Sequence, residues 1–491
     1  MKTTNTNTGP GFAWAHCGGA LLGLTVSMAW LSRVFVYGSP MGERPIPLLV
    51  ALLFTAGLVY CATLFLGRGS NSTPKLMTWI FLVGLAMRLC YFASTPILED
   101  DYYRYLWDGA VTASGHNPYA HSPESVQLME KQVPDTLLDL GMDAGQVLDR
   151  VNHPELTTVY PPVAQGAFAM AHVLVPWSIT GLRILYLILD CISFLLLLHL
   201  LSQCFKPFWL ITVYWWNPLL IKEAFNSVHM DLLLVPCLAL LALLVLQRRY
   251  VVAQLPLVAA IGIKVWPILL LPLLFAPLLK HPVALMKATL LLLLLGCVLI
   301  LPLYPLIQPA HDSGFSEYAT RWEMNDALFM AFPWVVEKVD ALLNLELTTP
   351  TTHRMGRILV ALLCVIIALV VGLRTRKHPD RFNHAALIIT ATLFLLSPTQ
   401  FPWYAFWLFP FLMVRPVPGL LLLTPMLSLY YLRFYYTHLD QADFFHNRVV
   451  WVEYAPVFLV LVLSWMLSLK AKGNKKVGEG VVTNKQSSGP S

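Results

Sequence analysis

Long apolar stretches recur along this chain of 491 residues, and they constrain its fold more than any other feature. A membrane-spanning helix needs about 20 consecutive apolar residues. Candidate spans lie at 12–37, 46–66, 76–95, 182–201, 208–222, 229–246, 284–306, 355–373, 382–398, 402–414, 418–433 and 449–469. Only 12% of the residues are charged, whereas soluble domains carry roughly 25%. The sequence therefore predicts an all-α polytopic membrane protein, a multi-spanning helical bundle.

Short basic clusters between the apolar stretches set the expected orientation, because such clusters favour the cytoplasmic side. They are Arg68 with Lys75, Lys206, Arg248 with Arg249, Lys280 with Lys287, the run 374–377, Arg415 and the tail from Lys470. The stretch 251–279 then has both ends inside, so we expect a hairpin of two short helices. Glycine and proline at 262–267 break it and place Lys264 at the outer tip. This topology has about fourteen crossings and both termini inside.

The orientation divides the chain into six segments, two of which are long outer loops. Three spans occupy 1–95; the first outer loop, with interfacial helices, is 96–180; further spans and the broken hairpin occupy 181–306; the second outer loop is 307–354; the last spans occupy 355–469; and a disordered cytoplasmic tail fills 470–491. We expect 164–177 to form an interfacial or re-entrant helix that begins at the proline pair 161–162. Both outer loops are net acidic.

The net charge of +6 does not indicate a nucleic-acid partner, because the basic residues are the short clusters that set topology. All eight cysteines lie in or at the edge of apolar stretches. We therefore expect neither nucleic-acid binding nor a disulfide framework.

Four carboxylates and one arginine follow the third apolar stretch directly: Glu99, Asp100, Asp101, Arg104 and Asp108. On a helix, Asp101, Arg104 and Asp108 share one face. The plainer interpretation is a self-neutralising surface helix. Charged groups at a membrane surface are nevertheless costly unless they are solvated, paired or used. A carboxylate is also what an enzyme needs to deprotonate an alcohol.

Further polar side chains fall on the same predicted outer side. They are His153 and Tyr160 in a proline-rich segment, Asn226 and His229 in a turn, the lone cation Lys264, Arg321 in the second loop, and Gln400 and Trp403 in an aromatic turn. Plainer interpretations are a connecting loop, a snorkelling lysine and an interfacial aromatic belt. His229 and Asp231 are poorly spaced to chelate one metal on a helix. We therefore prefer a hydrogen-bonding role toward substrate and expect no metal site.

Taken in order, these pieces resemble the bacterial polyprenol-phosphate-mannose-dependent mannosyltransferases of the GT-C superfamily. The resemblance covers roughly 95–405 and rests on Asp-Tyr-Tyr-Arg-Tyr-Leu-Trp-Asp-Gly at 101–109, Gly-His-Asn-Pro-Tyr at 115–119, His-Pro-Glu-Leu-Thr-Thr-Val-Tyr-Pro-Pro at 153–162, Lys-Val-Trp-Pro at 264–267 and Ser-Pro-Thr-Gln-Phe-Pro-Trp at 397–403. It implies a GT-C-like bundle, a catalytic aspartate in the first outer loop, inverting transfer from a polyprenyl-phosphate sugar, and no nucleotide. Asp101 occupies the family's aspartate position, with Asp100 beside it.

We therefore expect an inverting membrane glycosyltransferase. It would move a hexose, mannose by the resemblance, from a polyprenyl-phosphate donor to a lipid or glycan acceptor on the outer face of a bacterial plasma membrane. Asp101 or Asp100 is the expected base, and no cofactor is expected. The expected substrate-binding residues are Arg104, Asp108, His153, Tyr160, Asn226, His229, Lys264, Arg321, Gln400 and Trp403.

Two other classes remain open at this point. A transporter or flippase of lipid-linked sugars predicts ionisable groups deep in the spans and an inverted repeat. The clearest deep charge is Asp190, and no repeat is visible. A structural subunit of an envelope-assembly complex would not need polar residues that converge on one side.

Overall fold

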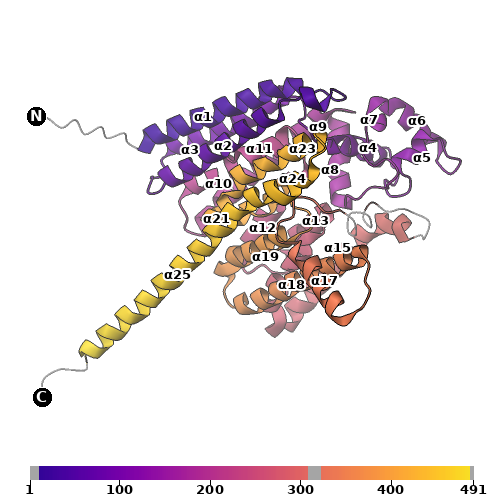
Figure 1. Cartoon of the computed structure of the whole chain (residues 1–491). Coiled ribbons are helices and arrows are strands. Elements are labelled where there is room, and N and C mark those ends of the chain that lie inside the picture. Colours follow the sequence, from indigo (N-terminus) through magenta and orange to yellow (C-terminus); the bar gives the residue numbers. More distant parts are fainter. Residues whose placement is uncertain (1–9, 308–313, 315–321, 487–491) are drawn as a thin grey trace, which may run out of the picture.

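The computed structural model describes residues 10–307, 314 and 322–486, and helices dominate this part of the chain (Figure 1). Its long helices are α1 Pro10–Leu31, α2 Ile46–Leu66, α3 Pro74–Cys90, α9 Ile179–Gln203, α15 Pro282–Ile300, α18 Thr349–Thr375 and α25 Val450–Gln486. The described ranges contain no β-strand, and one isolated parallel bridge joins Met324 to Thr399. The predicted all-α class is therefore confirmed.

Seven helices of the described residues are long and apolar enough to cross a membrane. The segments are Gly11–Val34, Ile46–Leu66, Pro74–Ala93, Ile179–Gln203, Pro282–Leu306, Thr349–Thr375 and Ala442–Lys470. The number rises to eight if Pro218–Phe225 and Met230–Leu246, which are bent by 106°, form one broken span. The chain is thus a multi-pass membrane protein, with fewer continuous spans than the about fourteen crossings predicted from charge.

Prolines explain the difference, because a proline removes a helical donor and clashes with the preceding turn. The apolar stretches outside the seven helices consist mostly of short pieces. These are η4 Phe208–Ile211, α10 Thr212–Trp215, α11 Pro218–Phe225, η5 Met230–Leu233, α12 Leu234–Leu246, α19 Phe382–Leu396, η10 Pro402–Trp407, α20 Phe409–Val414, α21 Pro418–Leu421, α22 Leu423–Met426, η11 Leu427–Tyr431 and α23 Leu432–His438. The predicted spans 208–222, 402–414 and 418–433 are therefore not continuous helices.

The stretch 251–279 is broken at the predicted position. Helix α13 (Gln254–Ile263) ends before Lys264, and the chain resumes as η6 (Trp266–Leu270), α14 (Leu271–Phe275) and η7 (Ala276–Lys280). The amide of Lys264 still donates to the carbonyl of Ala260, and its own backbone is extended. The break therefore fixes Lys264 between two short apolar helices.

The first long loop folds into helices packed beside the bundle (Figure 1). They are α4 Asp101–Ala113, α5 Pro123–Gln127, α6 Asp135–Ala144, α7 Gln146–Asp149 and α8 Pro162–Leu174. Helix α8 begins at the proline pair, as predicted, and its 13 residues are too few for a span. Helices α4 and α8 cross closely at Gly109, where an added Cβ would lie 2.5 Å from the carbonyl oxygen of Phe168. Glycine is thus required there to seat α4.

The final helix differs from expectation. We predict a disordered tail from Lys470, whereas α25 continues to Gln486 and projects from the body of the molecule in Figure 1. Extending an existing helix adds one hydrogen bond per residue without a new nucleation cost. This continuation explains helix in a segment whose composition alone indicates disorder.

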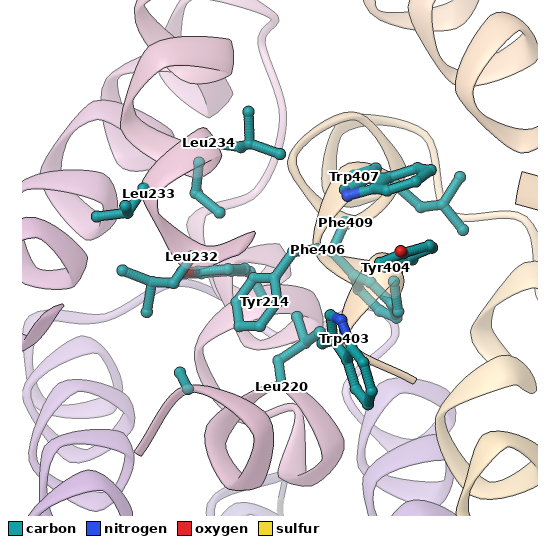
Figure 2. Close-up of a cluster of buried hydrophobic side chains, with 14 of the residues drawn as sticks. Tyr214, Leu220, Leu232, Leu233, Leu234, Trp403, Tyr404, Phe406, Trp407 and Phe409 are labelled. Carbon is teal, nitrogen blue, oxygen red and sulfur yellow. The ribbon is translucent and has the colours of Figure 1, made fainter. Parts of the chain in front are cut away.

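Aromatic residues of η10 form part of the core next to the loop helices. Figure 2 shows Trp403, Tyr404 and Trp407 of η10 near Leu220 of α11 and Leu232 of η5. All five side chains are buried. This packing holds η10 rigidly where it faces the cavity described next.

Candidate active site

A cavity of about 920 Å³ opens beside the start of α4. Its lining includes seven of the predicted residues: Asp100, Asp101, Arg104, His153, Tyr160, Lys264 and Trp403. The spanning helix α18 adds Val360, Ala361 and Cys364, and its Arg357 lies at the same helical face. The cavity therefore combines carboxylates with an apolar wall from a membrane span.

Two adjacent carboxylates stand at the start of α4 and share one amide. Asn152 Nδ2 donates to Asp101 Oδ1 at 2.8 Å and to Asp100 Oδ1 at 3.2 Å. Asp100 is the residue that precedes the helix, and burial followed by the charge of Asp101 raises the pKa of its carboxyl. Asn152 thus fixes both side chains through their Oδ1 atoms. It donates no hydrogen bond to Asp101 Oδ2.

Glu99 is a third carboxylate of the cavity wall, outside the predicted site residues. Burial is the main cause that raises its pKa to about 7, with His229 opposing and Asp101 adding to the rise. Its Oε1 atom is buried and has no hydrogen-bond partner. A buried carboxyl oxygen without a partner is costly, which is typical of a group kept for function.

His229 lies behind Asp101, with its Nε2 atom 4.0 Å from Asp101 Oδ2. Its Nδ1 atom is 3.0 Å from Glu223 Oε2, and its ring stacks on Trp403 with centroids 3.7 Å apart. The side chain is fully buried, and Nε2 has no hydrogen-bond partner. Glu223 fixes the ring so that Nε2 faces the carboxylate. His229 lies behind the cavity wall and does not line the cavity, so its position does not support the prediction that it binds substrate.

Asn226 and Arg183 hold the segment that leads into these carboxylates. Asn226 Oδ1 accepts from the amide of Ile97, and its Nδ2 donates to Ser94 Oγ. The guanidinium of Arg183 donates to the carbonyls of Phe92 and Ser94. Asn226 is fully buried and does not line the cavity, so the prediction that it binds substrate is not supported by its position.

Backbone strain is concentrated around the same cavity. Leu98 precedes the carboxylates with φ 63°, Val228 precedes His229 with φ 52°, and His153 has φ 48°. Positive φ is uncommon for residues other than glycine and is a marked outlier for β-branched valine. Strain of this kind persists where the surrounding structure over-determines the backbone and is frequent at functional sites.

Lys264 is paired, contrary to the prediction of a lone cation. Its Nζ atom lies 2.8 Å from Asp231 Oδ1 and 3.8 Å from the ring centroid of Tyr404. Trp407 Nε1 also donates to Asp231 Oδ1, at 2.7 Å. Sequence analysis found no acid near Lys264 because Asp231 comes from the neighbouring turn after α11. The lysine therefore closes a wall of the cavity with its charge already compensated.

Arg104 and Asp108 organise the loop from inside α4. Arg104 donates to the carbonyls of Asn152, His153 and Leu156, all within 3.1 Å. Asp108 is buried outside the cavity lining and accepts from Gln165 Nε2 at 3.1 Å. Burial raises the pKa of Asp108, and the charge of Arg104 opposes the rise. Their contacts assign both residues to shaping the site.

Some of the remaining predicted residues line the cavity, and others pack in the protein interior. The ring of Tyr160 packs edge-on against Tyr105 in the cavity wall, and the half-exposed His153 pairs with Glu155. Gln400 is fully buried, and its Nε2 donates to the carbonyl of Ser397. Gln400 is thus part of the scaffold. Arg321 lies outside the described residues.

Several wall residues were not among the predicted site residues. They are Glu99, Asn152, Asp231, Glu323, Arg357 and Arg433. Arg357 Nη2 is 3.0 Å from Glu323 Oε1, which also accepts from His353 Nδ1. The available signal for Asp231 was its place in the polar turn with Asn226 and His229, between two apolar stretches. Arg433 lies in a stretch that sequence analysis treats as a span. In the described ranges, no group of three or more His, Cys, Asp or Glu side chains could hold a metal ion.

The part of the chain that carries these residues is similar to a known protein family. Residues 11–280 match the family described as "Alpha-(1->6)-mannopyranosyltransferase, N-terminal domain". The match covers more than half of the chain and includes Glu99, Asp101, His229 and Lys264. No curated protein and no solved structure matches.

Proposed function

The chain belongs to the alpha-(1->6)-mannopyranosyltransferase family, and we propose that it takes mannose from a polyprenyl-phosphate donor on the outer face of a bacterial plasma membrane. Family membership makes it a glycosyltransferase that moves mannose, and its seven apolar helices place it in a membrane. The apolar face of α18 supports a lipid-linked substrate, because it lines the same cavity as the carboxylates. The basic clusters support the outer orientation.

The observation that carries the proposal is Asp101, an aspartate held by Asn152 in the wall of a cavity with an apolar flank. We assign it as the general base. Asp101 removes the proton from an acceptor hydroxyl as that oxygen forms a bond to the anomeric carbon. The bond from this carbon to the phosphate oxygen breaks, and the lipid phosphate leaves with the electron pair. A positioned base contributes about 10²–10⁴ in rate.

His229 acts through Asp101 in this proposal. With its Nδ1 proton held by Glu223, its Nε2 atom is free to accept a hydrogen bond once Asp101 carries the acceptor's proton. Closing the 4.0 Å gap between Nε2 and Asp101 Oδ2 needs only a small side-chain movement. His229 is therefore a positioning residue for the base.

A single displacement inverts the anomeric centre. The family description specifies an alpha-(1->6) linkage, so an inverting reaction in this chain requires a β-linked mannosyl phosphate and the 6-hydroxyl of an acceptor sugar. Solvent-exposed His153 and the neighbouring Trp322, whose ring centroids lie 5.2 Å apart, flank the cavity on the loop side. They support entry of a glycan or glycolipid acceptor from that side.

The test is transfer by purified protein in liposomes, with labelled mannose supplied either on polyprenyl phosphate or on a nucleotide. We expect label in an α-linked product from the lipid donor alone. Transfer from the nucleotide would contradict the donor assignment, and an α-linked product from an α-linked donor would contradict inversion. Adding an impermeant donor analogue to one side of sealed vesicles tests the outer orientation.

A further inference from the structure

The basic side chains that line the cavity are not equally available to an anionic ligand. Lys264 pairs with Asp231, and Arg357 pairs with Glu323. Arg104 is occupied by three loop carbonyls. Each of these cations already has its charge or its donors engaged by the protein.

Arg433 of α23 is the exception among the described cavity-lining cations. It has no carboxylate within salt-bridge distance in the described part of the chain, and its Nη1 donates to Tyr430 Oη at 2.9 Å. Its guanidinium packs 5.1 Å from the ring centroid of Phe434. The other guanidinium donors remain for a ligand, because an arginine presents five N–H groups in a planar fork.

The surroundings of Arg433 also present an unsatisfied acceptor. Glu99 lines the same cavity, lies within electrostatic reach of Arg433, and has a buried Oε1 atom without a partner. Tyr430 is fully buried, and its ring meets Phe401 edge-on. An arginine fork, a phenol and an unpaired carboxyl thus border one part of the cavity.

We propose that Arg433, with Tyr430 and Glu99, forms the binding site for the phosphate of the lipid-linked donor. This inference rests on the proposed function and names the residues that hold its donor. Guanidinium groups bind phosphate through paired charge-assisted hydrogen bonds. Glu99 in its neutral form donates a hydrogen bond to a phosphate oxygen, and in its ionised form it repels the phosphate. Lys264, which sequence analysis expects to bind substrate, instead holds Asp231, which also accepts from Trp407.

The experiment measures binding without turnover. Purified full-length protein in detergent is titrated with a polyprenyl phosphate that carries no sugar, and the bound fraction is read by native mass spectrometry. We expect Arg433→Ala to weaken binding about tenfold or more, since hydrogen bonds to charged groups contribute about 1.5–3 kcal/mol. The affinity of Arg433→Lys for polyprenyl phosphate should lie between those of the wild type and Arg433→Ala. Arg448→Ala is the matched control, because Arg448 is exposed on a neighbouring segment and does not line the cavity.

Each outcome decides the proposal. Unchanged binding in Arg433→Ala, or an equal loss in Arg448→Ala, overturns the site. Inorganic phosphate and phosphatidylglycerol titrations separate the sources of the anion, and an Arg433-dependent affinity for either that matches polyprenyl phosphate overturns the lipid assignment. If Arg433→Ala does not fold, Arg433→Lys and Tyr430→Phe supply the same test. Failure of mannose transfer by the wild type, with Arg433-dependent lipid binding intact, contradicts the proposed function and leaves this site standing.

Discussion

Two groups of buried charge among the described residues differ in how completely they are satisfied. Between α3 and α9, Arg88 Nε lies 2.5 Å from Asp190 Oδ2, and Tyr214 donates to the other carboxylate oxygen. Arg88 Nη1 also donates to the carbonyls of Gly84 and Trp215. Sequence analysis noted Asp190 as a deep charge that could indicate transport. Its complete pairing identifies it instead as a structural contact between helices.

The group beside the cavity is incompletely satisfied. Glu99 Oε1 and His229 Nε2 are buried without partners, and Asp101 keeps about a quarter of its side chain exposed. Unpaired buried polar atoms destabilise a fold, and Glu99 lines the cavity, so we infer that a bound substrate completes the hydrogen bonds of this carboxyl. In these two groups, complete pairing distinguishes the contact between α3 and α9 from the carboxylates beside the cavity.

The largest expected effect on the transfer rate distinguishes Asp101 from Asp100. Asp101→Asn preserves shape and removes the base, so we expect the transfer rate to fall by about 10²–10⁴ with the thermal midpoint unchanged. Asp100→Asn should cost much less. Rates are measured with saturating lipid donor and acceptor. Full activity in both variants would refute the mechanism, and the reverse order would move the base to Asp100.

A substitution in the fully paired group of Arg88 and Asp190 should lower the stability of the fold. Asp190→Asn leaves Arg88 buried without its counter-charge, and breaking one partner of a buried pair costs about 3–5 kcal/mol. We expect a lower thermal midpoint and a near-normal rate per folded molecule. A large fall in rate with an unchanged midpoint would remove the distinction between the two groups. Arg33→Ala, at an exposed position, is a suitable control.

His229→Gln tests the role of the ring that lies behind Asp101. It leaves Asp101 in place but removes a ring nitrogen that can accept its proton. We expect the catalytic rate to fall about tenfold, less than on loss of the base, with an unchanged KM for donor. The pH profile of the rate should also change shape. A changed donor KM with an unchanged pH profile would return His229 to the substrate-binding role.

The smallest expected effect is that of pH on the affinity for the donor. Because the pKa of Glu99 is raised to about 7, its carboxyl is mostly neutral below that pH and ionises as pH rises through it. Donor affinity should therefore fall a few-fold above pH 7, and Glu99→Gln should flatten this dependence. A phosphodiester-linked sugar is the suitable ligand, since phosphomonoesters titrate in the same range. The groups that share this environment are His229, Asp101, Lys222, Arg433, Tyr430 and Tyr431. An identical pH dependence in the variant would contradict the role of Glu99.

Local sequence signals predicted the elements that depend on neighbours in the chain. Proline and glycine located the break at Lys264 and the start of α8, and long apolar runs located the seven extended spans. The same rules predicted continuous helices at 208–222, 402–414 and 418–433, where the structure has short pieces. Hydropathy does not distinguish a continuous span from apolar helices that proline divides into short pieces packed inside the protein.

The pairing of charges could not be read from the sequence. Lys264 and Asp231 are 33 positions apart, and their contact depends on the bend between α11 and α12. Arg433 lies in a stretch whose composition indicates a span, and only tertiary packing turns it toward the cavity. The residue types of the site were therefore predictable, whereas the division into engaged and available charges required the fold.

The most direct test is an experimental structure of the protein with a non-hydrolysable phosphonate analogue of polyprenyl-phosphate mannose. The distances from its anomeric carbon and phosphorus atom to the surrounding side chains test both the assignment of Asp101 as the base and that of Arg433 as the phosphate ligand. We expect the anomeric carbon beside Asp101, with room for an acceptor oxygen between them, and the phosphonate hydrogen-bonded to Arg433. A headgroup bound away from Asp101, with Glu99 and His229 still unpaired, would contradict it.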